Sequence, residues 1–456
     1  MNKIKTKLAK RFSEKSVKEL VLGSGASFLV KLSGILFAFL FNWIVTKIYG
    51  ASELGILTSA IAVLSLGAIF TKFGVDTAFL RFVASYKISN IEYIKEIERK
   101  SYFINIVLSV FITGIVYLNA EWIATSVFKK DILTDSIRII SFGFLPFTLF
   151  SLHSEGLRAL KDVKSYAFIQ MTGRFMFGFM VIIVLNFAIN IQINPVIVFV
   201  VSLYLTLVFS FFQWQRKKRV LYKSLKTESD SFPLKDKIFS YRHIFNLSSP
   251  LMLAASSTFL MNWTDILLLT YFESADQIAI YSIAVKFGML SKIILTSVNA
   301  IAAPQFATAF YNKNINDLRT FVQSSTKLIF YTSLPILLIS ILFPNFLLGL
   351  YGQEFTNASN ALILFALAQF ISSISGSVGY LLQMTGKQKV YQNITLISTF
   401  LNIGLNFILI PKLGINGAAL SGFITIILKN LYSVYYIKKE FNFTTIYLPY
   451  SKKLWI

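Results

Sequence analysis

The chain has 456 residues, of which 55% are hydrophobic and only 14% are charged. Ordinary soluble domains carry about 25% charged residues, so this composition excludes a soluble globule and indicates a membrane protein. The formal net charge of +23 does not require a nucleic-acid partner, because positive loops are typical of the cytoplasmic side of membrane proteins, and the absence of cysteine excludes disulfides and thiol-ligated metal sites.

Apolar segments long enough to cross a bilayer follow one another along nearly the whole chain. The basic start, Met1–Lys18, resembles the first region of a signal peptide, but the apolar stretch after it is too long for one, so we expect a retained first helix. These spans leave no room for a separate catalytic or nucleotide-binding domain. About twelve membrane-spanning helices are predicted, at residues 20–46, 54–74, 101–120, 134–156, 165–188, 194–214, 245–271, 279–302, 323–349, 359–383, 391–410 and 415–437.

Lysine and arginine are concentrated in every second loop. The two termini and the loops on the same side hold about three quarters of them, whereas the opposite loops hold only Lys47, Lys129, Lys130 and Lys412. This asymmetry predicts that both termini lie in the cytoplasm. The run RKKR at 216–219 is expected to contact anionic lipid headgroups.

The longest polar segment, residues 216–242, divides the chain into an N-terminal lobe at 1–215 and a C-terminal lobe at 243–456. The two halves are alike: YGASE at 49–53 corresponds to FESAD at 272–276, and residues 157–166 correspond to residues 382–391. Six helices in each half would insert both halves the same way up, as parallel repeats. A duplicated unit of this kind favours a transporter, with a duplicated membrane scaffold as the alternative.

Several short motifs occur in a recognisable order. They are DILLL at 265–269, IYSIAVK at 280–286, Ala303-Pro304, LNIGLN at 401–406 and LGINGAA at 413–419. Together they resemble the polysaccharide-transporter branch of the multidrug/oligosaccharidyl-lipid/polysaccharide exporter superfamily. That branch includes flippases that move undecaprenyl-diphosphate-linked O-antigen or capsule repeat units across the bacterial inner membrane. The resemblance implies an all-α polytopic, MATE-like fold with two six-helix lobes, and alternating access as its mechanism.

Four positive side chains stand well inside the predicted spans: Lys31, Arg174, Lys286 and Lys292. A charge at the centre of a bilayer costs on the order of 2.5–3.5 kcal/mol by insertion scales, so it persists where it faces a wet cavity or a partner. Lys31 belongs to a small, polar stripe on its helix, as does Arg174 with Gln170 and Gly178. Lys292 belongs to a stripe from Tyr281 to Asn299, and Lys286 lies on another face. We predict a cationic cavity that binds a diphosphate, with interhelical pairing as the alternative.

Two acidic residues are candidates for a coupling or pairing role. Asp265 is either a carboxylate that takes up H⁺ or Na⁺, the partner of an interior cation such as Lys286 or Lys292, or a structural acid; we favour the partner. For Asp76, an ion pair with Arg81 at a helix end is favoured over a gate. Asn402 and Asn406 are four residues apart, so they share a helix face and could hydrogen-bond across helices.

The signatures of several enzymes are missing. Gly386-Lys387 is preceded by Leu381 where a nucleotide-binding loop would need glycine, and the two histidines, His153 and His243, are far apart in sequence. We therefore expect a transporter without a cofactor, whose partners are a lipid-linked oligosaccharide, membrane lipids and possible assembly proteins such as a polymerase. An ion-coupled multidrug exporter and a scaffold of a polysaccharide-synthesis complex are the alternatives; the exporter would be expected to carry acidic cavity residues.

Overall fold

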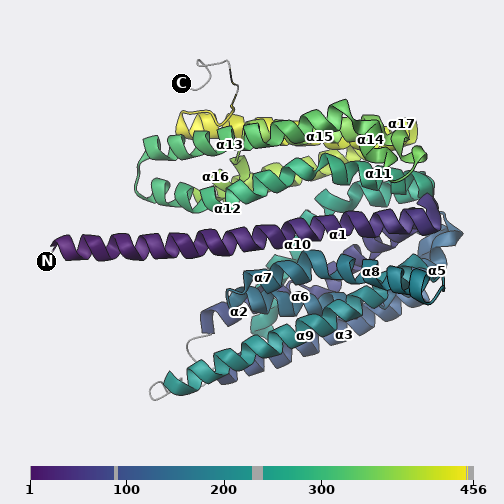
Figure 1. The fold of residues 1–456 in the computed structure, drawn as a ribbon, viewed down its shortest axis with the longest axis horizontal. Helices are drawn as coiled ribbons and strands as arrows, with labels where there is room; N and C mark the ends of the chain where they lie inside the picture. Colours follow the sequence, from purple (N-terminus) through teal and green to yellow (C-terminus); the bar gives the residue numbers. More distant parts are fainter. Residues whose placement is uncertain (1, 87–90, 229–239, 448, 450–456) are drawn as a thin grey trace. The chain divides into compact units, whose positions relative to one another are not determined.

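The computed structural model describes residues 2–86, 91–228, 240–447 and 449. Across these ranges the regular elements are all helices, which run mostly antiparallel to their neighbours along the chain within each half (Figure 1). The all-α class expected from the sequence is confirmed.

Contacts divide the chain into two compact units. The N-terminal unit comprises Met1–Ile48 and Ala60–Ser256, and the C-terminal unit comprises Tyr49–Ser59 and Ser257–Ile456. The division falls inside helix α10 (Tyr241–Phe272) rather than in the predicted linker. The first part of that linker continues helix α9 as far as Glu228, and residues 229–239 lie outside the described part of the chain.

The N-terminal unit is built from helices of very different lengths. In chain order they are α1 (Asn2–Lys72), α2 (Val75–Tyr86), α3 (Ile91–Leu118), α4 (Ala120–Trp122), η1 (Ile123–Val127), η2 (Asp131–Leu133), α5 (Thr134–Ser141), α6 (Phe144–Ala159), α7 (Val163–Ala167), η3 (Phe168–Gly173), α8 (Arg174–Ile183), η4 (Val184–Ala188), α9 (Pro195–Glu228) and the first half of α10.

The C-terminal unit contains the short segment Tyr49–Ser59 of α1 and everything after the middle of α10. Its further helices are α11 (Ala275–Gly288), α12 (Leu290–Tyr311), α13 (Ile315–Leu342), α14 (Pro344–Gly349), η5 (Gln353–Ala358), α15 (Ser359–Ser375), α16 (Val378–Met384) and α17 (Gln388–Phe441).

Glycine explains why some predicted spans are joined. Among the described residues, eight helices are long and apolar enough to cross a membrane. The number is nine if the segments 131–141 and 144–159, which are bent by 46° at the break between them, count as one span. Helices α1 and α17 each cover two predicted spans, because the chain turns at Gly50 (φ 87°) and Gly414 (φ 57°) while the residues on either side are helical. Only glycine adopts such positive φ values readily. The arrangement agrees with about twelve spans.

Besides the fourth span, which is bent at residues 142–143, and the ninth, which breaks at Phe343, three more predicted spans contain interruptions that periodicity did not indicate. The eighth breaks at Met289, between α11 and α12, and the tenth breaks between α15 and α16 at Gly376 (φ 75°). The fifth contains the π-helical segments η3 and η4, each of which shifts the helical register.

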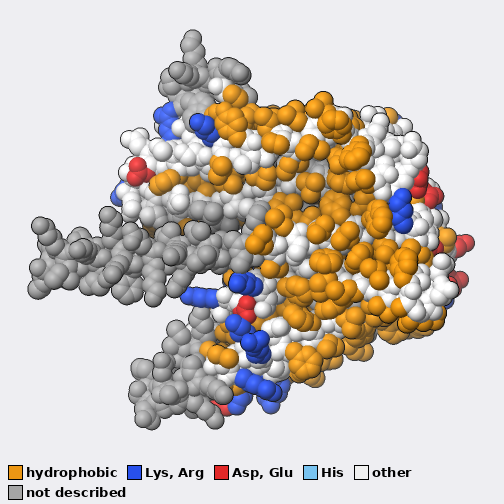
Figure 2. Space-filling model, viewed as in Figure 1, with side chains coloured by type: hydrophobic (Ala, Val, Ile, Leu, Met, Phe, Trp, Pro, Cys, Tyr) orange, Lys and Arg blue, Asp and Glu red, His pale blue; other side chains and the backbone are white. Residues whose placement is uncertain are grey.

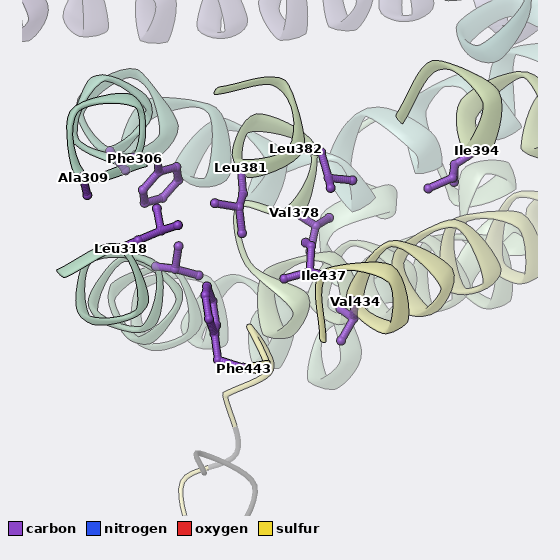
Figure 3. Packing of buried hydrophobic residues seen from close by; sticks show 12 residues of the cluster. Phe306, Ala309, Leu318, Val378, Leu381, Leu382, Ile394, Val434, Ile437 and Phe443 are labelled. Carbon is purple, nitrogen blue, oxygen red and sulfur yellow. The ribbon is translucent and has the colours of Figure 1, made fainter. Parts of the chain in front are cut away.

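The core of the C-terminal unit includes a cluster in which helix ends meet the tail of the chain (Figure 3). Phe306 of α12, Leu318 of α13, Leu381 of α16 and Ile437 of α17 are fully buried there, and Phe443 packs beside them after α17 has ended. Within a bilayer, close packing of this kind replaces the hydrophobic effect as the source of cohesion between helices.

Lysine and arginine side chains gather at the end of the N-terminal unit where α7 begins and α9 ends, beside a broad hydrophobic surface (Figure 2). Lys217 of α9 pairs with Asp162 at 3.0 Å, and Asp162 also caps α7 by accepting a hydrogen bond from the backbone of Ser165. Burial of the Asp162 carboxyl opposes ionisation, but the hydrogen bonds from Lys217 and Ser165 outweigh it and hold its pKa below the ordinary 3.8.

A first prediction concerns Gly74, which has φ 71° and packs against α10. A Cβ there would lie 2.4 Å from the carbonyl oxygen of Ser248, and left-handed backbone costs other residues about 1–2 kcal/mol. Gly74→Ala should therefore lower the Tm of the purified protein. The control is Gly114→Ala in α3, where a Cβ meets nothing within 4 Å and the helix should gain about 0.5–1 kcal/mol. Equal Tm changes in both variants would contradict this packing.

A second prediction concerns pH. Because the pKa of folded Asp162 lies below its unfolded value, its contribution to stability is present above about pH 4 and is lost as the pH falls through the folded pKa. Asp162→Asn keeps a good capping residue but removes the charge, so it should lower Tm near pH 7 and lower it less near pH 3. Lys164→Gln, at an exposed neighbouring position, is the control. A deficit of the same size at both pH values would contradict the role of the charge.

Candidate functional site

Two cations of the N-terminal unit share one aromatic ring. The guanidinium of Arg174, the first residue of α8, lies 5.8 Å from the centre of the Phe147 ring and 4.9 Å from that of Phe175. Lys72, the last residue of α1, places its ammonium 4.3 Å from the same Phe147 ring. Cation–π contacts of this kind partly replace the lost hydration of a buried cation.

The hydrogen-bond partners of this pair are neutral. Lys72 donates to the hydroxyl of Ser151 at 2.7 Å, and Gln170 donates to Ser151 at 3.2 Å and to Ser154 at 2.6 Å. Among the described residues, the Nε of Arg174 is buried and has no hydrogen-bond partner. A buried donor without a partner costs free energy, so the Nε–H group of Arg174 is available to donate a hydrogen bond to an acceptor.

The predicted stripe of Gln170, Arg174 and Gly178 is only partly correct. Gln170 and Arg174 both reach α6, but a Cβ on Gly178 would lie 2.7 Å from Phe41 of α1, which places Gly178 against a different neighbour. Arg174 and Gly178 are one turn apart in the regular helix α8, so the two positions meet different neighbours along the helix. The sequence did not single out Lys72 as a candidate binding residue, because a lysine at the end of a predicted span looks like any lysine of a cytoplasmic loop.

The acids near this pair are few. Glu155 of α6 pairs with Arg158 at 3.3 Å. Asp76, in the first turn of α2, accepts a hydrogen bond from the backbone N–H of Thr77 at 2.7 Å. The expected ion pair between Asp76 and Arg81 is not among those formed by the described residues; Arg81 is exposed instead. Asp76 and Glu155 are nevertheless near enough to attract Lys72, and this attraction opposes the repulsion from Arg174.

Lys31 lies on α1, half-buried, next to the point where the backbone oxygen of Val30 accepts a hydrogen bond from Thr172 at 3.0 Å. Helix α1 therefore touches η3 close to Arg174. In the part of the chain that the structure describes, no hydrogen bond or ion pair joins Lys31 to another side chain. Its predicted role in substrate binding stays a prediction.

In the C-terminal unit, Asp265 is held by neutral donors from two other helices. Tyr281 of α11 donates to its carboxylate at 2.9 Å, and Asn406 of α17 donates at 2.6 Å and also to Asn402 at 3.1 Å. The predicted bond across helices from the Asn402 and Asn406 face is confirmed. The favoured pairing of Asp265 with Lys286 or Lys292 is wrong, because neither pair occurs among the ion pairs of the described residues. Tyr281 and Asn406 satisfy the carboxylate instead.

Lys286 and Lys292 lie on either side of a break in the helix. Lys286 is in the last turn of α11 and half-buried, whereas Lys292 is near the start of α12 and exposed. The predicted stripe from Tyr281 to Asn299 is therefore not one helix face, since the chain turns at Met289. Neither lysine forms a hydrogen bond or ion pair within the described ranges, so both remain candidates for an anionic ligand.

His153 is part of a buried structural chain. One ring nitrogen contacts the hydroxyl of Tyr102, and the other contacts the hydroxyl of Ser210 at 2.8 Å, which links α3, α6 and α9. Among the described residues, no group of three or more His, Cys, Asp or Glu side chains could hold a metal ion.

Comparisons with known proteins agree with the fold. A family described as "Polysaccharide biosynthesis protein" matches residues 44–360. The "Probable low-salt glycan biosynthesis flippase Agl15" of Haloferax volcanii is 23% identical over 47% of this chain, and the chain spans less than half of that relative, 45% of its length.

Among solved structures, the lipid II flippase MurJ in an inward closed conformation has a TM-score of 0.71 at 17% identity, with 92% of this chain and 89% of that chain covered. An inward-facing multidrug resistance MATE family transporter has a TM-score of 0.68 at 15% identity, with 91% and 98% covered. The fold is therefore MATE-like, as the sequence predicted.

A third prediction concerns the Asp265 network. Tyr281→Phe removes a donor from a buried carboxylate, which should cost about 1–3 kcal/mol and lower Tm. The matched control is Tyr432→Phe, because Tyr432 is exposed and loses only a peripheral hydroxyl. Thermal unfolding of both purified variants tests this. A Tm for Tyr281→Phe as high as that of the control would show that the bond does not support the carboxylate.

Proposed function

We propose that this chain, which belongs to the polysaccharide biosynthesis protein family, is a flippase for a lipid-linked oligosaccharide. Its substrate would be an undecaprenyl-diphosphate-linked repeat unit, carried by alternating access from the cytoplasmic to the outer leaflet of the bacterial inner membrane, with both termini in the cytoplasm. The likeness to two membrane transporters and to a flippase of glycan biosynthesis supports transport rather than catalysis.

The single observation that carries the proposal is the pair Lys72 and Arg174 over the Phe147 ring. Two cations whose direct contacts are neutral repel each other, although Asp76 and Glu155 offset part of this repulsion at Lys72, and an anion that binds between them relieves the rest. A diphosphate supplies the negative charge and the oxygen acceptors that the unpartnered Arg174 Nε lacks. An organic cation would add to the repulsion, so the pair does not support a multidrug exporter of cations.

The chemistry of the two cations suits this ligand. The planar guanidinium of Arg174 can hold two phosphate oxygens in parallel hydrogen bonds, whereas the ammonium of Lys72 acts as a mobile point charge. The aromatic rings keep water from the guanidinium and so strengthen its attraction for phosphate. Lys31, Lys286 and Lys292 would be further contacts for the headgroup, and Asp265 is the proposed coupling carboxylate for H⁺ or Na⁺.

A fourth prediction tests the cation pair. Lys72→Gln and Arg174→Gln should each reduce display of the repeat unit on the cell surface at least about tenfold, because a charge-assisted hydrogen bond contributes about 1.5–3 kcal/mol. Arg174→Lys should keep more activity than Arg174→Gln if charge is what matters. The readout is surface glycan per cell, normalised to the amount of flippase in the membrane.

The control is Lys47→Gln, which removes an exposed lysine on the opposite side of the predicted topology. Its display should equal that of the unmodified protein. Normal display in both Lys72→Gln and Arg174→Gln would remove this site assignment. If cavity variants were harmless while loop variants abolished display, a scaffold in a polysaccharide-synthesis complex would be the better function.

A further inference from the structure

The basic run RKKR at 216–219 lies on α9, and the structure divides it into an inner and an outer pair. A regular α-helix turns by about 100° per residue, so neighbours in such a run point to different sides of the helix. Lys217 and Lys218 face other helices of the N-terminal unit, whereas Arg216 and Arg219 are exposed on the opposite side. The four cations therefore have two different roles.

The inner pair holds α9 to its neighbours. Lys218 pairs with both carboxylate oxygens of Glu98 on α3, at 2.9 and 3.0 Å, and the indole N–H of the buried Trp214 donates to the same carboxylate at 2.8 Å. Lys217 pairs with Asp162 at the start of α7, at 3.0 Å. Because carboxylates already match these two charges, only the outer pair remains for the lipid contact expected from the sequence.

The outer pair has no such counter-charge. In the part of the chain that the structure describes, neither Arg216 nor Arg219 forms an ion pair, and both are exposed. They are three residues apart, so their side chains are neighbours on one face of the helix. A guanidinium holds phosphate oxygens in parallel hydrogen bonds, so two of them side by side suit a phosphate group.

This face of α9 is apolar along its membrane-spanning part. Exposed apolar side chains recur on it at three- and four-residue steps: Val201, Leu205, Val208 and Phe212. The same steps lead on to Arg216 and Arg219, beside the hydrophobic surface of this unit (Figure 2). About 20 residues cross the hydrocarbon core, so a helix that enters it at Pro195 leaves it at about residue 214. The stripe thus changes from apolar to basic at the depth of the lipid phosphates.

We propose that Arg216 and Arg219 form a binding site for the headgroup of an anionic phospholipid, in the leaflet at this end of α9, and that Lys217 and Lys218 take no part in it. The acyl chains lie along the apolar stripe, and the phosphate meets the two guanidinium groups. A lipid with net negative charge binds more tightly than a zwitterionic one, because the same guanidinium groups repel a choline. The inference is independent of the proposed function, since no transported substrate enters it.

The experiment counts the lipids bound to the purified full-length protein in detergent by native mass spectrometry, during titration with phosphatidylglycerol or phosphatidylcholine. The unmodified protein should bind phosphatidylglycerol more tightly. Arg216→Gln/Arg219→Gln should raise the Kd for phosphatidylglycerol at least about fivefold and leave the Kd for phosphatidylcholine unchanged. Its Tm without added lipid should equal that of the unmodified protein, because both side chains are exposed.

The matched control is Lys217→Gln/Lys218→Gln, which removes the same amount of charge from the same run. It should keep the affinity for phosphatidylglycerol but lower Tm without added lipid, since Asp162 and Glu98 lose their partners. If this double variant folds poorly, a comparison of Arg216→Gln with Lys217→Gln serves, because each removes one charge.

Two outcomes would overturn the proposal. Equal losses of affinity for phosphatidylglycerol in both double variants would show that the total charge of the run, and not its outer face, attracts the lipid. An unchanged affinity in Arg216→Gln/Arg219→Gln would show that this face does not bind a lipid headgroup and is left for another partner, such as an acidic protein. Neither result depends on surface display of a glycan, which reports the flippase function separately.

Discussion

The structure depends on one constraint: inside a bilayer, each polar group must find its partner within the protein, because lipid supplies none. Helices meet this constraint for the backbone, and glycine allows α1 and α17 to turn at Gly50 and Gly414 with few backbone groups released. The same constraint governs side chains. Asp265 receives its donors from Tyr281 and Asn406, which lie on two other helices, so the carboxylate helps to define how α10, α11 and α17 pack.

Each unit treats its buried charge differently. In the N-terminal unit, Lys72 and Arg174 lie over one aromatic ring and beside hydroxyl and amide groups, which lowers the cost of burial without neutralising the charge. In the C-terminal unit, Asp265 and Lys429 line the same pocket, but neutral donors occupy the acid. The first arrangement leaves two positive charges without an ion pair among the described residues, and the second satisfies a carboxylate with neutral hydrogen-bond donors.

Interruptions in helices determine where these groups lie. The π-helical turn η3 directs Arg174 toward α6, and the break at Met289 separates Lys286 from Lys292. Such local departures cost hydrogen bonds or strain, and they are common at functional sites for that reason. A regular helix in either place would present these cations to different neighbours.

The class of protein, the approximate spans and the candidate cations followed from the sequence, because hydropathy and the position of lysine and arginine depend only on the order of residues. The MATE-like fold was implied by the resemblance of the short motifs to a known superfamily. The shared face of Asn402 and Asn406 also followed, since helical periodicity holds there. Tertiary structure alone decided three features. They are the donors that hold Asp265, the position of Lys72 beside Arg174, and the absence of an ion pair between Asp76 and Arg81 among the described residues. These contacts join residues far apart in the chain or depend on breaks that periodicity does not reveal, so only the packing of the helices could determine them.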